Sequence, residues 1–176
     1  MKASVIPCAL LVSLAAPAAA DGPAVTADEV LAMMARVPGR PGDPRSTAYR
    51  WDKKRGAPSV ARAIAQTAPT REWAARMTVY AIHESGLQLE PCASGDGGKS
   101  LGPWQLGGVR EAVACDPDKA APIWLAKART SAQDCVKLSP DEAMAELVSG
   151  SCGKGRQLAR RREVLVLGAL DAPGVE

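Results

Sequence analysis

Apolar residues recur at intervals of three and four along most of the chain, which is the spacing typical of amphipathic helices. The clearest stripe of this kind consists of Trp73, Met77, Tyr80, Ala81 and Glu84. The apolar face of this helix therefore ends in a carboxyl group, and Gly86 two residues later is expected to end the helix. A carboxyl group at the end of a buried stripe loses hydration, which raises its pKa. We therefore expect Glu84 to be a proton donor near neutral pH.

Helix start and stop signals predict further helices on both sides of this stripe. A capping box formed by Thr26 and Glu29 begins a first helix, and Thr70 caps the central one. Asp116 followed by Pro117 begins a long helix that runs to about residue 136. The other predicted helices cover residues 59–67, 104–114, 142–149 (after a second capping box, Ser139 with Glu142) and 156–167. The pattern as a whole predicts an all-α fold.

The first 20 residues have the features of a secretory signal. Lys2 supplies a positive start, residues 5–16 are mostly apolar, and Ala-Ala-Ala at 18–20 is a cleavage site of small residues. The apolar run is too short for a membrane-spanning helix, and no later stretch is long and apolar enough to span a bilayer. We therefore expect an exported protein, periplasmic or secreted, without a membrane span after removal of the signal.

Stretches rich in Pro, Gly and charged residues divide the chain into four parts. We expect a signal peptide over 1–20, an N-terminal helix and Pro/Gly-rich linker over 21–58, one helical domain over 59–170, and a tail over 171–176. Trp51 lies among basic residues of the linker and could stack on a sugar ring, but packing onto the domain surface is favoured for an amphipathic Trp.

Size and composition fit one soluble domain with a modest aromatic content. The chain has 176 residues, and removal of the signal leaves 156, which suffices for one core. Phe is absent, so Ala, Leu, Val, Met and the four Trp residues must fill that core. Without Lys2 the 22 basic residues become 21 against 19 acidic ones, a formal charge of +2. This balance gives no argument for nucleic-acid binding.

Four cysteines remain after the signal, and an even number in an exported chain predicts two disulfides. Three connectivities are open, of which we favour Cys92 with Cys115 and Cys135 with Cys152, because each pair closes a short loop around a motif. A zinc site is disfavoured, since the cysteines lack the close spacing of zinc ligands and His83 is the single His.

Three consecutive arginines, Arg160, Arg161 and Arg162, form the most basic run of the last predicted helix. They could meet an acidic cell-wall polymer. Adjacent helix positions point in different directions, however, so a solvated helix face is the favoured interpretation.

Two short stretches resemble motifs of a known family, the lysozyme-like lytic transglycosylase (SLT-type) domain. The first is Glu-Ser-Gly at 84–86, and a Gly-rich stretch separates it from the second, Leu-Gly-Pro-Trp-Gln-Leu at 101–106. The residues that match the second motif are Gly102, Gln105 and Leu106. Pro103 and Trp104 stand where Leu and Met are usual. The third motif of the family contains Tyr-Asn and would fall within 146–155, where this chain is Gly-rich but has neither residue.

The resemblance spans roughly residues 70–165 and implies a lysozyme-like helical domain with the Gly-rich loop beside a cleft. It implies cleavage of the β-1,4 bond between N-acetylmuramic acid and N-acetylglucosamine in peptidoglycan, with Glu84 as acid and base. Ser85, Trp104 and Gln105 would contact the glycan strand, and a Gln amide can bond an N-acetyl group. No cofactor, metal or nucleic acid is expected, and the protein is expected to act as a monomer.

The nature of the reaction stays open at this point, because glycosidases usually place two acids around the bond. Asp96 is the second candidate, and its twelve-residue separation from Glu84 resembles goose-type lysozyme sites; Asp96-Gly97 is equally ordinary turn chemistry. A lytic transglycosylase needs Glu84 alone, whereas a lysozyme-type hydrolase would use both acids. A non-catalytic peptidoglycan-binding envelope module is a further alternative, whose best support is the missing Tyr-Asn, and a secreted inhibitor or structural disulfide protein also stays open.

Overall fold

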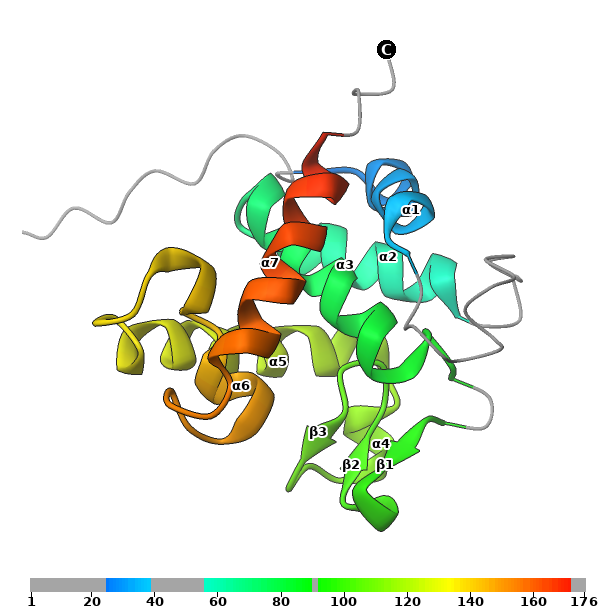
Figure 1. Cartoon of the computed structure of the whole chain (residues 1–176). Helices are drawn as coiled ribbons and strands as arrows, with labels where there is room; N and C mark the ends of the chain where they lie inside the picture. The colour runs from blue at the N-terminus through cyan, green and yellow to red at the C-terminus, as the bar shows by residue number, and fades with distance from the viewer. Residues whose placement is uncertain (1–24, 39–55, 90–91, 172–176) are drawn as a thin grey trace, which may run out of the picture.

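The computed structural model describes residues 25–38, 56–89 and 92–171 (Figure 1). Within them the chain forms the helices α1 (Ala27–Arg36), α2 (Ala57–Thr67), α3 (Arg71–Ser85), α4 (Glu111–Ala114), α5 (Pro117–Asp134), α6 (Ala145–Ser149) and α7 (Arg156–Leu170), with short 3₁₀ helices η2 (Asp96–Gly98) and η3 (Pro140–Glu142). It also forms the strands β1 (Ser94–Gly95), β2 (Ser100–Leu101) and β3 (Leu106–Gly107). The predicted helical architecture is confirmed, but the all-α description was incomplete, because strands of two residues are too short to show an alternating pattern.

Some sequence predictions fall on residues outside the described ones. These are the signal peptide over 1–20, the Pro/Gly-rich part of the linker over 39–55 with Trp51, and the end of the tail over 172–176. In the part of the chain that the structure describes, no helix has the length and apolar character needed to cross a membrane.

The local signals that begin and end the first helices act as predicted. The hydroxyl of Thr26 accepts a hydrogen bond from the backbone N–H of Glu29, whose carboxylate accepts one from Thr26 in return. Thr70 caps α3 by accepting from the N–H of Trp73. Gly86 ends α3 in the left-handed conformation, with φ 61°. Both ends of the central helix are therefore encoded within a few residues of where they occur.

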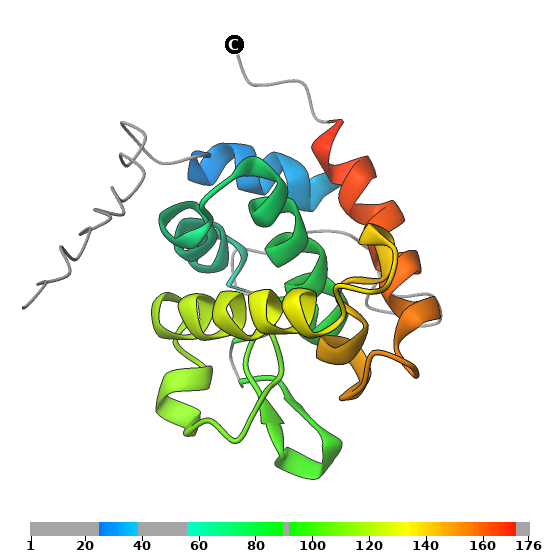
Figure 2. The ribbon, with the colours of Figure 1, turned by 90° about the vertical axis from the view of Figure 1, so that its left-hand side faces the viewer.

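The helices enclose one hydrophobic core in which α3 is central. Helix α1 packs against α2 and α3, α2 packs against α5, and α3 lies along α7 (Figure 1). The largest fully buried apolar side chains are those of Trp124, Tyr80, Met33, Met34, Ile64 and Met77. Figure 2 shows α5 lying across the molecule, with α1 and α2 on one side and the small sheet on the other. Leu106 of β3 is buried in this core and Leu101 of β2 packs against it, which joins the sheet to the helices.

The small sheet replaces much of the helix that was predicted over 104–114. Antiparallel pairing places Ser94 opposite Leu101 and Ser100 opposite Gly107. The prediction was wrong because Gly102, Gln105 and Gly108 have φ of 79°, 49° and 72°, so the chain turns repeatedly, and only α4 is helical.

The second capping box was also a wrong prediction. Ser139 makes no side-chain cap, and the helix expected over 142–149 divides into η3 and α6. The carboxylate of Glu142 is fully buried and is instead paired with two arginines of α7, at 2.9 Å from Nε of Arg156 and in contact with Arg160. A buried carboxylate needs full charge compensation, which these guanidinium groups supply and a local cap does not.

Both favoured disulfides are present. Cys92 is bonded to Cys115 and Cys135 to Cys152. The first joins the segment before β1 to the end of α4, and the second joins the end of α5 to the segment before α7. The first disulfide therefore ties the start of the small sheet to α4, and the second ties the start of α7 to the end of α5.

Candidate active site

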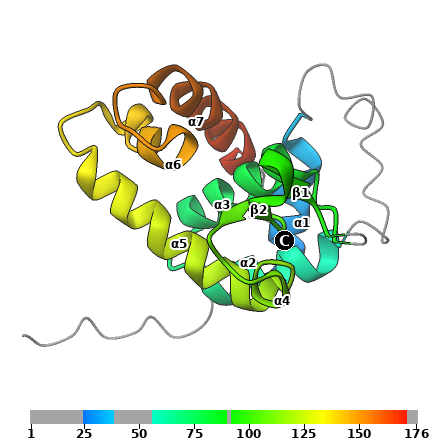
Figure 3. The same cartoon turned by 90° about the horizontal axis from the view of Figure 1, so that it is seen from below.

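A cleft of about 240 Å³ lies where α3, the small sheet, α5 and α6 approach one another. Figure 3 shows these elements from the sheet side of the molecule. The polar and charged residues that line the cleft are Tyr80, Glu84, Asp96, Ser100, Gln105 and Lys127. Its other walls come from Trp104, Leu106, Gly107, Trp124, Leu147 and Val148. Residues from both motif stretches therefore meet in one hollow.

Glu84 reaches this cleft from the last turn of α3. Its side chain is 29% exposed, so the carboxylate is accessible without being fully hydrated. Gly86, in the left-handed conformation, ends α3 two residues after Glu84 and so leaves Glu84 in the last turn of the helix. Position and accessibility are those of a group that can exchange a proton with a bound molecule.

The surroundings of Glu84 differ from the purely apolar recess that the stripe predicted. Nη1 of Arg162, from α7, lies 2.5 Å from Oε1 of Glu84. The Arg162 side chain is only 9% exposed, and its Cζ lies 4.5 Å from the centre of the Tyr80 ring. The favoured interpretation of the arginine run as a solvated face was therefore wrong for Arg162, since a buried guanidinium requires a counter-charge and finds it in Glu84.

Aromatic rings form the floor beneath the acid. Tyr80 and Trp124 lie with ring centroids 5.2 Å apart, and Trp104 lies 6.5 Å from Trp124. Tyr80 is buried, and burial is the main cause that raises the pKa of its hydroxyl well above the usual 10.0, so the phenol stays neutral at physiological pH. Its hydroxyl has no hydrogen-bond partner among the described residues. The floor thus combines apolar rings with one neutral hydroxyl.

Asp96, the second predicted carboxylate, lines the same cleft from η2. It is exposed, has φ 50°, and accepts a hydrogen bond of 3.1 Å from the hydroxyl of Ser100. A non-glycine residue with positive φ carries backbone strain, which is common at functional sites but also ordinary for Asp in a turn. The structure thus brings both candidate carboxylates, Glu84 and Asp96, to one cleft.

The three residues expected to contact a glycan are placed in different ways. The Nε2 group of Gln105 lines the cleft but donates to the carbonyls of Ala93 and Gly102, at 3.2 and 2.9 Å, so it also holds the loop. Trp104 is 3% exposed and belongs to the floor rather than the rim. The Ser85 hydroxyl donates to the carbonyl of Ala81 and accepts from the N–H of Leu87, which stabilises the end of α3.

Several residues of the site were missed by sequence reasoning. Lys127 lies on α5 and donates to the carbonyl of Gly107 at 3.1 Å, so it joins α5 to the sheet at the cleft. Tyr80 could have been found, because it precedes Glu84 by one turn on the same stripe. Arg162 and Lys127 carried no local signal, since their neighbours at the site come from other helices and loops.

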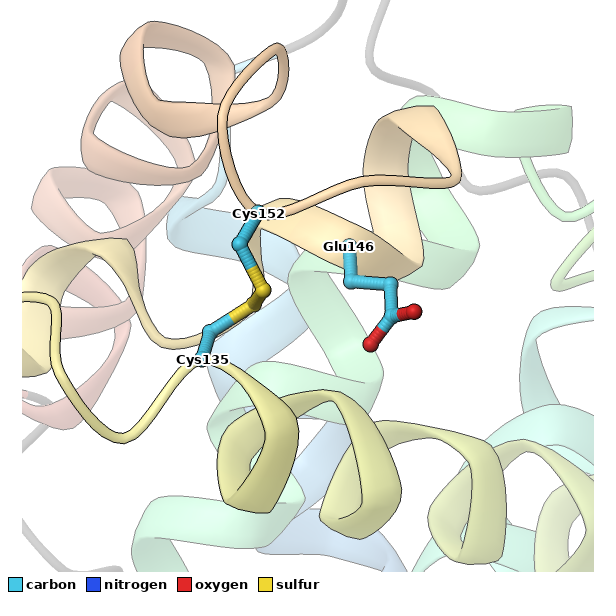
Figure 4. A group of neighbouring side chains, drawn as sticks. All are labelled: Cys135, Glu146 and Cys152. Carbon is cyan, nitrogen blue, oxygen red and sulfur yellow. A yellow bond between two sulfur atoms is a disulfide. The ribbon is translucent and has the colours of Figure 1, made fainter.

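One other group of side chains brings possible metal-ligand atoms together. Cys135, Cys152 and Glu146 have ligand atoms within 4.8 Å of one another, and Figure 4 shows the two sulfurs joined, with Glu146 beside them on α6. Sulfurs bonded to each other offer no thiolate to a metal ion. In its oxidised form this group is therefore a structural crosslink next to a carboxylate.

Comparisons with known proteins add no relative to this description. No protein-family model matches the chain. Searches among curated proteins and solved structures likewise find no match. The arguments on function therefore rest on the residues of the cleft.

Proposed function

We propose that the protein is an exported peptidoglycan-cleaving glycosidase of the lytic transglycosylase type, with Glu84 as its acid and base. The observation that carries this proposal is the meeting of the two motif stretches, 84–86 and 101–106, in one cleft with an accessible carboxylate. The expected substrate, the β-1,4 bond between N-acetylmuramic acid and N-acetylglucosamine, follows from the resemblance of these stretches to the lysozyme-like family.

The shape of the cleft suits a reaction at one bond of a longer chain. At about 240 Å³ it lies below the roughly 300–1,000 Å³ typical of small-molecule pockets, so it holds the sugar at the cleaved bond while the remaining polymer lies outside. The partly exposed side chains of Leu147 and Val148 provide apolar surface for a sugar face, and Asp96 and Lys127 provide polar partners.

In the first step Glu84, in its protonated form, gives its proton to the glycosidic oxygen. The bond between that oxygen and C1 of the muramyl sugar breaks as positive charge develops at C1, and N-acetylglucosamine leaves with a free 4-hydroxyl. The carboxylate that remains on Glu84 is positioned to stabilise the charge on the sugar.

In the second step the Glu84 carboxylate acts as a base. It takes the proton of the muramyl 6-hydroxyl while that oxygen bonds to C1, giving a 1,6-anhydro sugar and restoring the protonated acid. This route uses one carboxyl group, consumes no water and requires no cofactor. It therefore does not depend on Asp96.

Two observations favour specific alternatives. Asp96 lines the same cleft, which favours a lysozyme-type hydrolase that uses both acids and releases reducing ends. The ion pair between Glu84 and Arg162 favours a non-catalytic peptidoglycan-binding module, because an acid that serves only to neutralise a buried arginine need not react.

The test is digestion of isolated peptidoglycan with the wild-type protein, Glu84→Gln and Asp96→Asn, followed by mass spectrometry of the released fragments. The proposal predicts anhydro ends from the wild type and from Asp96→Asn, and no release by Glu84→Gln although binding to the wall persists. Release of fragments with reducing ends by the wild type, and of none by either variant, would establish the hydrolase instead. Binding without release by any of the three proteins would establish the module, and absence of binding would exclude all three functions.

A further inference from the structure

We propose that Arg162 is a positioning residue for Glu84, which fixes the orientation of the carboxyl group. This inference rests on the proposed function of Glu84 and deepens it. The side-chain atoms that carry it are Nη1 of Arg162 and Oε1 of Glu84, which lie 2.5 Å apart.

The geometry holds the arginine more firmly than the acid. Arg162 is 7% exposed, and its guanidinium lies over the Tyr80 ring, with Cζ 4.5 Å from the centroid. A cation over an aromatic face gains electrostatic attraction, most of all where water is excluded. Glu84 is 29% exposed on its side chain. The acid is therefore the accessible partner of a pair whose other member is anchored in the core.

A neighbouring ion pair, in which the acid lies on α7 and the base on α3, also holds α7 against α3. Arg76 of α3 donates to Glu163 of α7 through both Nε and Nη2, at 3.3 and 2.6 Å. Consecutive residues of α7 thus bind α3 with opposite charges, Arg162 to an acid and Glu163 to a base. Because α7 is held at two points, Arg162 cannot slide along α3 away from Glu84.

This arrangement has a direct consequence for proton transfer. The contact uses Oε1 of Glu84, which leaves Oε2 for the glycosidic oxygen and the 6-hydroxyl. A fixed carboxyl group removes the rotational search that a free glutamate side chain would make, and misplacement by about 1 Å can cost about 100-fold in rate.

Other charged and titratable groups near Glu84 are few in the described residues. On α3 they are Tyr80, whose phenol is neutral, and His83, the preceding residue. On α7 they are Arg162 itself and Glu163, the latter paired with Arg76. Across the cleft they are Asp96 and Lys127. Among the described residues Arg162 is the one in ion-pair contact with Glu84, so its removal should dominate any change in the placement of the carboxyl group.

The experiment compares kcat and KM for the release of soluble muropeptides by wild type, Arg162→Met, Arg162→Lys and the control Arg76→Met. Arg162→Met keeps an apolar side chain but removes the charge, and Arg162→Lys keeps the charge. Arg76→Met breaks an ion pair between the same two helices without touching Glu84, which makes it a matched control for helix docking.

We expect Arg162→Met to lose about 10- to 100-fold in kcat with little change in KM, because it disturbs placement and not binding. Arg162→Lys, which keeps a cation at this position, should recover part of the lost kcat. Arg76→Met should lose stability but keep the wild-type kcat and KM. Equal kcat values for Arg162→Met and Arg76→Met would overturn the proposal and leave a purely structural pair.

A second measurement keeps the inference separate from the enzymatic proposal. The side-chain NMR signals of Glu84 are compared in wild type, Arg162→Met and Arg76→Met. If the wild type cleaves nothing, the proposed function fails, yet separate signals of the two Glu84 Cγ protons that merge only in Arg162→Met would still support positioning by Arg162. No difference between the two variants would reject that positioning whether or not the protein is an enzyme.

Discussion

The indole nitrogen of Trp104 donates a hydrogen bond of 2.9 Å to the main-chain oxygen of Met77. This contact joins the second motif stretch to α3, on the same face of the helix that carries Glu84 further along. Because Trp104 is almost fully buried, the bond is shielded from water and fixes the distance between the loop and the acid. The floor of the cleft and its carboxyl group are therefore parts of one packed unit.

Substitution of Trp104 tests this connection. Trp104→Phe keeps an aromatic ring in the floor but loses the donor, and we expect a loss of about 1–2 kcal/mol in the free energy of unfolding from the missing bond and the smaller volume. Trp104→Ala should cost about 3–5 kcal/mol. Urea denaturation measures both. A Phe variant as stable as wild type would show that the bond contributes nothing to folding.

A close approach of two backbones makes Gly102 irreplaceable. A Cβ at Gly102 would lie 1.8 Å from the carbonyl oxygen of Ala114, and the residue has φ 79°. Gly102→Ala must move backbone, so we expect it to destabilise the protein by more than about 2 kcal/mol. Gly97→Ala is the matched control, because Gly97 has φ 67° with open space around it and should cost only about 1–2 kcal/mol of left-handed strain. Equal losses in thermal or urea unfolding would contradict this account.

The two disulfides are expected to contribute similarly to stability. Their sequence separations are 23 for Cys92–Cys115 and 17 for Cys135–Cys152. Loops of this length restrict the unfolded chain by about 3 kcal/mol each, so replacement of either pair by alanine should lower the free energy of unfolding by about that amount. Denaturant titration of the two double variants tests this. A difference above about 1 kcal/mol would show that contacts in the folded state, not loop closure, dominate one of them.

Stability should fall in acid, and Glu142 should account for part of the loss. The hydrogen bond from Arg156 is the main cause that lowers the pKa of the Glu142 carboxyl below its usual 4.5. A group with a lowered pKa in the folded state contributes stability that is present above its unfolded pKa and is lost as pH falls through its folded pKa. Hydrogen bonds from Lys119 to Asp116 and from the Thr26 backbone to Glu29 lower the pKa of those acids in the same sense.

The variant Glu142→Gln measures how much of the loss of stability in acid comes from this residue. At neutral pH the variant should melt at a lower temperature than wild type, because Arg156 and Arg160 lose their buried counter-charge. The difference should narrow as pH falls below about 4.5 and the wild-type carboxylate takes up a proton. Melting temperatures from about pH 2 to about pH 8 provide the measurement. A difference that stays constant with pH would mean that Glu142 acts through packing and not through charge.

The sequence predicted those features that depend on neighbours in the chain. The caps at Thr26 and Thr70 and the stop at Gly86 are local hydrogen-bond or backbone effects, and each lies where it was expected. The disulfide pairs also followed from short loops. The helix expected over 104–114 failed because Gly102 is held by contact with Ala114, a tertiary constraint that overrides the helix-forming residues between them.

The residues of the candidate site likewise fall into those that the local sequence predicted and those that depend on the packing of helices. Glu84 and Asp96 were predicted from their stretches, and both line the cleft. Arg162 was assigned to solvent because its run gives no indication of which arginine meets an acid on another helix. Only the packing of α7 on α3 decides that Arg162 is buried while Arg161 is exposed. Pairings of this kind are long-range choices among many partners, and a single sequence does not rank them.

The order of the charged residues on α3 and α7 also favours the observed alignment of the two helices. With Glu84 facing Arg162 and Arg76 facing Glu163, α7 meets α3 with both charge pairs satisfied. A shift of α7 by one residue would place Glu163 opposite Glu84 in one direction and Arg162 opposite Arg76 in the other. A nascent chain that has completed α3 but not yet α7 consequently holds Glu84 without this counter-ion. Docking of the final helix and neutralisation of the cleft carboxylate are thus a single event.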